Sequence, residues 1–187
     1  IESASETLQR IFDGHGSVLG SQMADESSRY DVLKKTDFPK PQRTRRIAVA
    51  NQKGGVGKTT STVNTAAALA KKGAQVLVID MDPQGNASTA LGVSHASGEP
   101  SVYDVIEGRS DLGDVITVCP DFPTLDVVPA SIDLSGAELE VADLPNRNTL
   151  LKEALDLYLR QSDKHYDYVF IDCPPSLGLL VINAMCA

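Results

Sequence analysis

Residues 47–60 read IAVANQKGGVGKTT, in which a short apolar run leads into a glycine-rich loop. The run at 47–51 is typical of a buried strand, and residues 58–72 carry apolar side chains at helical spacing. A glycine-rich loop between a strand and a helix is the setting in which such loops bind phosphate groups. The sequence therefore predicts a phosphate-binding loop, or P-loop, over residues 53–60.

The composition of this loop indicates how it would hold a nucleotide. Glycines allow backbone N–H groups to turn toward the phosphates, and the following helix adds the positive end of its dipole. Lys58 is placed to reach the outer phosphates, and the Thr59 hydroxyl is placed to ligate Mg²⁺. No N-K-x-D-type guanine motif is visible, which speaks against a GTPase. The residues predicted to bind the nucleotide are Lys53, Gly54, Gly55, Val56, Gly57, Lys58, Thr59 and Thr60.

Two further apolar runs end in acidic residues. The first leads into Asp80 and Asp82, and the second leads into Asp172. Acids at the carboxyl ends of parallel strands face the crevice where ligands bind. We predict that Asp82 orients the attacking water, that Asp172 holds Mg²⁺, and that Asp80 supports either Mg²⁺ or the loop. The alternative for Asp80 and Asp82 is that they only stabilise the turn at Pro83.

Short apolar strands alternate with helices along the rest of the chain. Further strands are expected at 115–118, 125–128 and 166–172, and further helices at 101–107, 135–142, 149–161 and 177–187. This alternation predicts an α/β fold with a twisted, mostly parallel sheet and helices on both faces. Because the last helix stops with the chain, the fold is expected to be incomplete at its C-terminus.

Residues 1–46 differ in composition from the rest. They contain eight basic and seven acidic residues, with three glycines between 14 and 20 that interrupt any longer helix. We predict a flexible N-terminal arm over 1–46, with at most a helical turn near 7–12, and an ATPase domain over 47–187. The basic cluster at 40–46 is interpreted either as a solvated linker or as a contact to DNA or to a partner protein.

The net charge of the whole chain is -8. This acidity does not favour a general nucleic-acid binder, although a local basic patch can bind against the average charge. No apolar run approaches the roughly 18 residues needed to span a bilayer, and no secretory signal pattern is present. A cytoplasmic protein is therefore expected.

Three motifs together resemble the ParA/Soj partition ATPases of the ParA and MinD class. The P-loop has the form KGGxGKT, with Lys53 ahead of the glycines and Gln52 where the common pattern has glycine. The strings DPQGN at 82–86 and DCPPS at 172–176 resemble the two acidic loops of the same family. The resemblance covers residues 46–187 and implies a P-loop NTPase fold of the SIMIBI type.

The family resemblance implies a slow ATPase for chromosome or plasmid partition, located in the cytoplasm on the nucleoid. Mg-ATP would drive formation of a sandwich homodimer that binds double-stranded DNA without sequence preference, and a ParB-like centromere-binding partner would stimulate hydrolysis. No membrane partner is implied. Lys53 would cross to the phosphates of the second subunit, much as an arginine finger does. Lys58 and Asp82 would be the other catalytic residues.

Three other functions fit parts of the sequence. A MinD-like membrane-cycling ATPase would need an amphipathic C-terminal helix, and DPQGN and DCPPS speak against it. A nitrogenase iron-protein-like reductase or a cobyrinic acid amidating enzyme shares the P-loop, but Cys119 and Cys173 have no pattern typical of an iron–sulfur site. The third is an ATP-gated scaffold whose turnover serves only as a timer.

Overall fold

The structure is a computed structural model that describes residues 18–36 and 38–187. The chain divides into two units, Ile1–Pro39 and Lys40–Ala187. The first unit contains helix α2, Val18–Lys35. The helical turn expected near 7–12 lies outside the described residues. Gly20 was expected to interrupt a helix, but it lies in the first turn of α2. A single glycine in a helix costs only about 1 kcal/mol, so the helix can include it.

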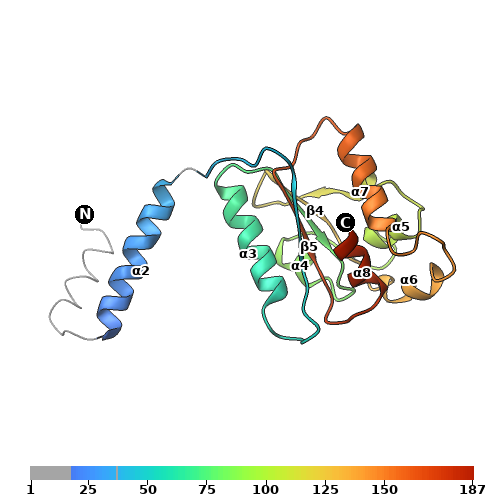
Figure 1. Ribbon diagram of the computed structural model, residues 1–187, viewed down its shortest axis with the longest axis horizontal. Helices are drawn as coiled ribbons and strands as arrows, with labels where there is room; N and C mark the ends of the chain where they lie inside the picture. Colours follow the sequence, from blue (N-terminus) through green and yellow to red (C-terminus); the bar gives the residue numbers. More distant parts are fainter. Residues whose placement is uncertain (1–17, 37) are drawn as a thin grey trace. The chain divides into compact units, whose positions relative to one another are not determined.

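The second unit is built on one sheet of five strands in the order β1-β5-β2-β4-β3 (Figure 1). The strands are β1 Arg45–Val49, β2 Val76–Asp80, β3 Thr117–Val118, β4 Leu125–Val128 and β5 Tyr168–Asp172. β1, β5, β2 and β4 are parallel to one another, and the short β3 is antiparallel to β4. The prediction of a mostly parallel sheet is confirmed.

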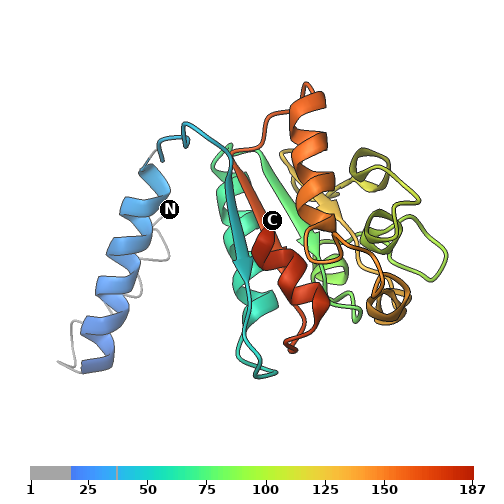
Figure 2. The same cartoon turned by 45° about the vertical axis from the view of Figure 1, so that its right-hand side comes forward.

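Helices cover both faces of this sheet (Figure 2). They are α3 Lys58–Lys71, α4 Asn86–Ala90, α5 Val102–Ile106, α6 Leu134–Glu140, α7 Leu150–Gln161 and α8 Leu179–Cys186, with a 3₁₀ turn at Leu112–Val115. Val76 and Val78 of β2 pack on the side of α3, whereas Leu77 and Ile79 pack on the side of α5 to α8. Both sets are fully buried. A strand covered on both faces must be apolar at every position, which explains the continuous apolar run of β2.

β1 is less buried than the sequence suggested. The run at 47–51 was expected to be a buried strand, but the strand is Arg45–Val49 and Ile47 is 36% exposed. The reason is position, because β1 is at the edge of the sheet and, among the residues that the structure describes, pairs with β5 alone. The prediction of a buried strand here is therefore wrong for this chain.

No helix in the described parts of the chain combines the length and apolar character needed to cross a membrane.

Candidate nucleotide-binding site

The predicted P-loop connects β1 to the N-terminus of α3, as the sequence indicated. Gly55 and Gly57 adopt positive φ angles of 70° and 88°, which only glycine adopts without strain. Gly57 is also the N-cap of α3 and offers no side chain to the first N–H groups of this 14-residue helix. These N–H groups and the helix dipole therefore point toward a site suited to an anion.

Asp172 ends β5 beside the start of α3. Its Oδ2 accepts a hydrogen bond from Thr59 Oγ1 at 2.7 Å, and its Oδ1 accepts one from Thr62 Oγ1 at 3.1 Å. The carboxylate is fully buried. The structure thus brings together Thr59 and Asp172, two of the residues predicted to hold one Mg²⁺ ion.

The acids at the ends of β2 and β5 are buried close together, so their negative charges repel one another. The strand register places Asp80 opposite Asp172. Burial raises the pKa of Asp172 despite its hydrogen bonds from Thr59 and Thr62, and the nearby charge of Asp82 raises it further. Burial also raises the pKa of Asp80 to about 6, with a smaller contribution from Asp172. A cation placed among these carboxylates would offset their mutual repulsion.

Asp80 is engaged by its own loop. Its Oδ1 accepts a hydrogen bond from the N–H of Asp82 at 3.1 Å, and its Oδ2 accepts from both the N–H and the hydroxyl of Ser88 at 2.8 Å. The Ser88 hydroxyl oxygen accepts in turn from the N–H of Ala130 at 3.1 Å. Of the two roles predicted for Asp80, this geometry favours support of the loop.

Asp82 lies in a tight turn after β2 and is 8% exposed. Its Oδ1 accepts a hydrogen bond from the N–H of Gln84 at 3.0 Å, and its carbonyl oxygen accepts from the N–H of Gly85 at 2.9 Å. Within residues 18–36 and 38–187, Oδ2 of Asp82 accepts no hydrogen bond. The turn therefore engages only one of the two carboxylate oxygens.

The two lysines of the P-loop differ in their surroundings. Lys58 is half-buried at the first position of α3, near enough to Asp172 for its charge to lower the pKa of that carboxyl. Lys53 is exposed at the start of the loop, where its N–H donates to Oδ1 of Asn51 at 2.9 Å. Lys58 thus lies near the acids of its own chain, whereas Lys53 lies on the surface.

Sequence reasoning missed two polar residues that organise the site, Thr62 and Ser88. Both are fully buried. Thr62 lies one helical turn after Thr59, so a polar residue on the inward face of α3 could have been noticed. Ser88 had no such signal, because the short helix α4 that carries it was not expected.

Thr62→Val is expected to lower the free energy of unfolding by about 1.5–3 kcal/mol, since the buried Asp172 carboxylate loses a donor while the packing volume stays almost the same. Urea unfolding without nucleotide measures the change. Thr60→Val, at an exposed position of the same helical turn, is the matched control. Equal effects of the two substitutions would show that the hydrogen bond to Asp172 contributes no stability.

The donors at this site suit magnesium chemistry. Among the described residues, no group of three or more His, Cys, Asp or Glu side chains could by itself hold a metal ion. Mg²⁺ needs less from the protein, because it is usually held by one or two carboxylates together with substrate phosphates and waters. The oxygen donors of Thr59 and Asp172, 2.7 Å apart beside the P-loop, fit that requirement.

A family model and two relatives of known name match most of this chain. The AAA domain family matches residues 44–187. The sporulation initiation inhibitor protein Soj of Bacillus subtilis is 50% identical over 141 residues, which are 75% of this chain and 54% of Soj. The chromosome partitioning protein ParA of Caulobacter vibrioides is 48% identical over 141 residues, covering 75% of this chain and 52% of ParA. The chain spans about half the length of these relatives.

A solved structure agrees with the fold. The crystal structure of cobyrinic acid a,c-diamide synthase from Mycobacterium smegmatis, with bound ADP and magnesium, has a TM-score of 0.69 and 40% identity. The alignment covers 77% of this chain and 57% of that chain. The predicted α/β P-loop fold is therefore confirmed.

Proposed function

Since this chain belongs to the AAA domain family and is similar to the partition proteins Soj and ParA over 75% of its length, we propose that it is the nucleotide-binding part of a DNA partition ATPase. The observation that carries the proposal is the 2.7 Å hydrogen bond from Thr59 to Asp172 beside a P-loop of the KGGxGKT form. In this proposal the protein acts in the cytoplasm on nucleoid DNA, and slow ATP hydrolysis serves as its switch.

In this proposal, different residues of the site bind the phosphates, the Mg²⁺ ion and the attacking water of Mg-ATP hydrolysis. Backbone N–H groups of residues 54–60 and the Lys58 ammonium hold the phosphates. Thr59 and Asp172 hold Mg²⁺, which when bound supplies positive charge to offset that of the phosphate oxygens. Asp82 orients the attacking water, and Asp80 keeps the Asp82 turn in place by accepting hydrogen bonds from the N–H groups of Asp82 and Ser88.

The segment after Asp172 is placed to respond to the bound nucleotide. Pro174 and Pro175 stiffen it, and a Cβ at Gly54 would lie only 4.0 Å from Cβ of Pro175. The P-loop and this segment are therefore neighbours. We infer that residues 172–176 shift when the γ-phosphate occupies the P-loop. Switch segments of other nucleotide-driven proteins likewise become ordered when the γ-phosphate is bound.

We further propose an ATP-dependent homodimer in which Lys53 of one subunit contacts the phosphates of the other. Its exposed position at the start of the loop supports this role. A ParB-like partner and non-specific double-stranded DNA are the other proposed partners, with no membrane partner.

Lys53→Ala is expected to retain ATP binding and to lose the turnover that depends on dimerisation, because the transferring phosphoryl group lacks a cation from the second subunit. The measurement is ATP turnover per subunit as a function of protein concentration, in the full-length protein. Wild type is expected to rise with concentration and the variant to stay flat. Undiminished turnover in the variant would contradict the role of Lys53.

The partition function is tested by ATP turnover of the full-length protein with and without non-specific double-stranded DNA. Turnover that is slow and raised by DNA supports the proposal. Turnover indifferent to DNA, combined with binding to liposomes, would favour a MinD-like membrane-cycling ATPase instead.

A cobyrinic acid amidating enzyme is the second candidate, because a structure of that name is 40% identical. The partition proteins Soj and ParA are closer in sequence, at 50% and 48% identity. ATP turnover that depends on cobyrinic acid and an ammonia donor, and not on DNA, would select the second candidate.

A further inference from the structure

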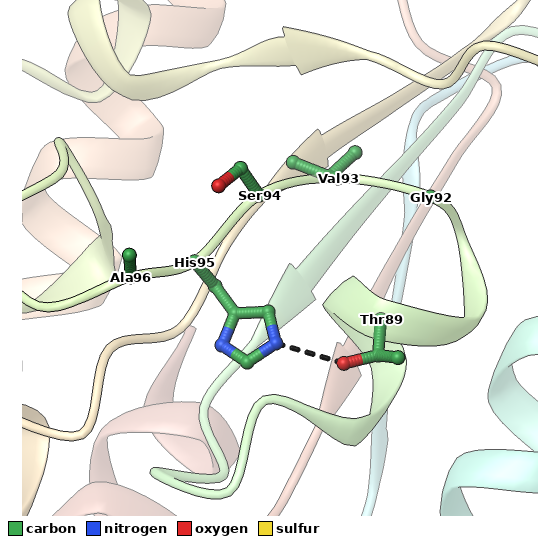
Figure 3. A pocket seen from close by; sticks show the side chains of 6 residues that line it. All are labelled: Thr89, Gly92, Val93, Ser94, His95 and Ala96. Carbon is green, nitrogen blue, oxygen red and sulfur yellow. Dashed lines mark hydrogen bonds between the residues drawn. The ribbon is translucent and has the colours of Figure 1, made fainter.

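His95 lies against the turn that carries Asp82, although it belongs to none of the motifs above. Figure 3 shows its ring directed from the loop after α4 toward the helix itself, where Nε2 lies 2.8 Å from Oγ1 of Thr89. This loop and Thr89 line an open hollow on the surface. The ring therefore occupies the space between the loop and α4.

The His95 ring also covers Gly85, the residue that closes the Asp82 turn. A Cβ at Gly85 would lie only 2.5 Å from Nδ1 and 2.6 Å from Cε1 of His95, so the imidazole is packed directly on the glycine backbone. Gly85 is buried, has a φ of 63°, and donates its N–H to the carbonyl oxygen of Asp82. Displacement of the ring would thus free the backbone that fixes Asp82.

The loop that presents His95 is held on both sides of it. The Ser94 hydroxyl and the N–H of Ala96 both donate to Oε2 of Glu99, at 2.6 and 3.0 Å. The N–H of Val93 donates to the carbonyl oxygen of Ser88 at 3.0 Å. Because its neighbours are anchored, the imidazole is presented to Gly85 at a fixed position rather than on a free loop.

We propose that His95 is a positioning residue that holds the Asp82 turn in the geometry required for ATP hydrolysis. The proposal rests on the role of Asp82 in the proposed function. Among the described residues, no hydrogen bond joins His95 to the P-loop at 53–60, so its effect falls on the hydrolytic step and not on nucleotide binding. A misplacement of about 1 Å in a reacting group can cost up to about 10²-fold in rate, which makes such support significant.

The first test does not depend on turnover. Amide hydrogen exchange of the full-length protein compares wild type with His95→Ala, with His95→Gln, whose amide can still reach Thr89, and with His165→Ala, a control whose side chain is 65% exposed. In His95→Ala the amides of Gln84 and Gly85 are expected to exchange roughly tenfold faster, with those of β2 unchanged. His95→Gln restores slow exchange. Unchanged exchange, or equal acceleration throughout β2, would overturn the proposal.

The second test measures kcat and the ATP dissociation constant separately. His95→Ala is expected to lower kcat roughly tenfold, with ATP affinity within about twofold of wild type. His95→Gln recovers most of kcat, and His165→Ala matches wild type. An unchanged kcat in His95→Ala would overturn the inference. A wild type without ATPase activity would refute the proposed function, whereas the exchange result would still decide whether His95 holds the turn.

Discussion

Lys58→Ala is expected to lower ATP turnover by about 10³-fold and to weaken ATP binding by roughly 10- to 100-fold. The side chain is half-buried at the first position of α3, where its charge acts on the buried Asp172 carboxylate. It therefore supplies positive charge where the N-terminus of α3 already attracts an anion. Alanine keeps the helix but removes that charge from the phosphates and from the transition state.

Binding of a fluorescent ATP analogue and release of phosphate measure the two effects in the full-length protein. Lys71→Ala is the matched control, since Lys71 is an exposed lysine in the last turn of the same helix. It is expected to behave like wild type. A Lys58→Ala variant that binds ATP as tightly as wild type would show that Lys58 does not contact the phosphates.

The site elements that sequence reasoning located correctly are those with local chemistry. The P-loop was found because glycines, a lysine and a threonine stand in fixed order between a strand and a helix. Helix α3 was expected at 58–72 and is Lys58–Lys71, and β4 was expected at 125–128 and is Leu125–Val128. Apolar periodicity and a glycine stop are sufficient to define such elements.

The parts that were missed depend on contacts that no helical or strand period contains. The strand expected at 115–118 is shorter in the structure, because a 3₁₀ turn at Leu112–Val115 ends at its first residue and only Thr117–Val118 pairs with β4. The helix α4 has five residues, too few for a periodic signal. It carries Ser88, whose N–H and hydroxyl donate to Oδ2 of Asp80. No local pattern contains such a contact.

The same limit applies to residue roles. The sequence placed Asp80, Asp82 and Asp172 at strand ends and predicted a role for each, but it left Asp80 between Mg²⁺ and the loop and showed none of their contacts. The structure distinguishes them by their partners: Asp172 is bonded to α3, Asp80 is enclosed by its own loop, and Asp82 engages one oxygen only. Their catalytic and metal-binding roles remain predictions, and the role of Asp82 has the sharpest test.

Asp82→Ala is expected to lower ATP turnover by about 10²- to 10⁴-fold, because the attacking water loses the carboxylate that orients it. ATP binding is expected to be equal to or tighter than in wild type. The Asp82 charge lies close enough to Asp172 to raise its pKa, so it also opposes the charge of bound phosphates. A variant that binds ATP well and hydrolyses it poorly would separate Asp82 from the residues that only hold the nucleotide.

Asp82→Asn separates this role from the alternative in which Asp82 only stabilises its turn. The asparagine side-chain oxygen can still accept the hydrogen bond that Gln84 donates at 3.0 Å, so the turn keeps its shape. If Asp82 acts through its charge on the water, Asn and Ala lower kcat to a similar extent. If it acts only on the turn, Asn retains turnover and Ala loses it together with stability. Phosphate release and urea unfolding on both variants decide between the two, because Ala removes both the charge and the side-chain acceptor for the Gln84 N–H, whereas Asn removes only the charge.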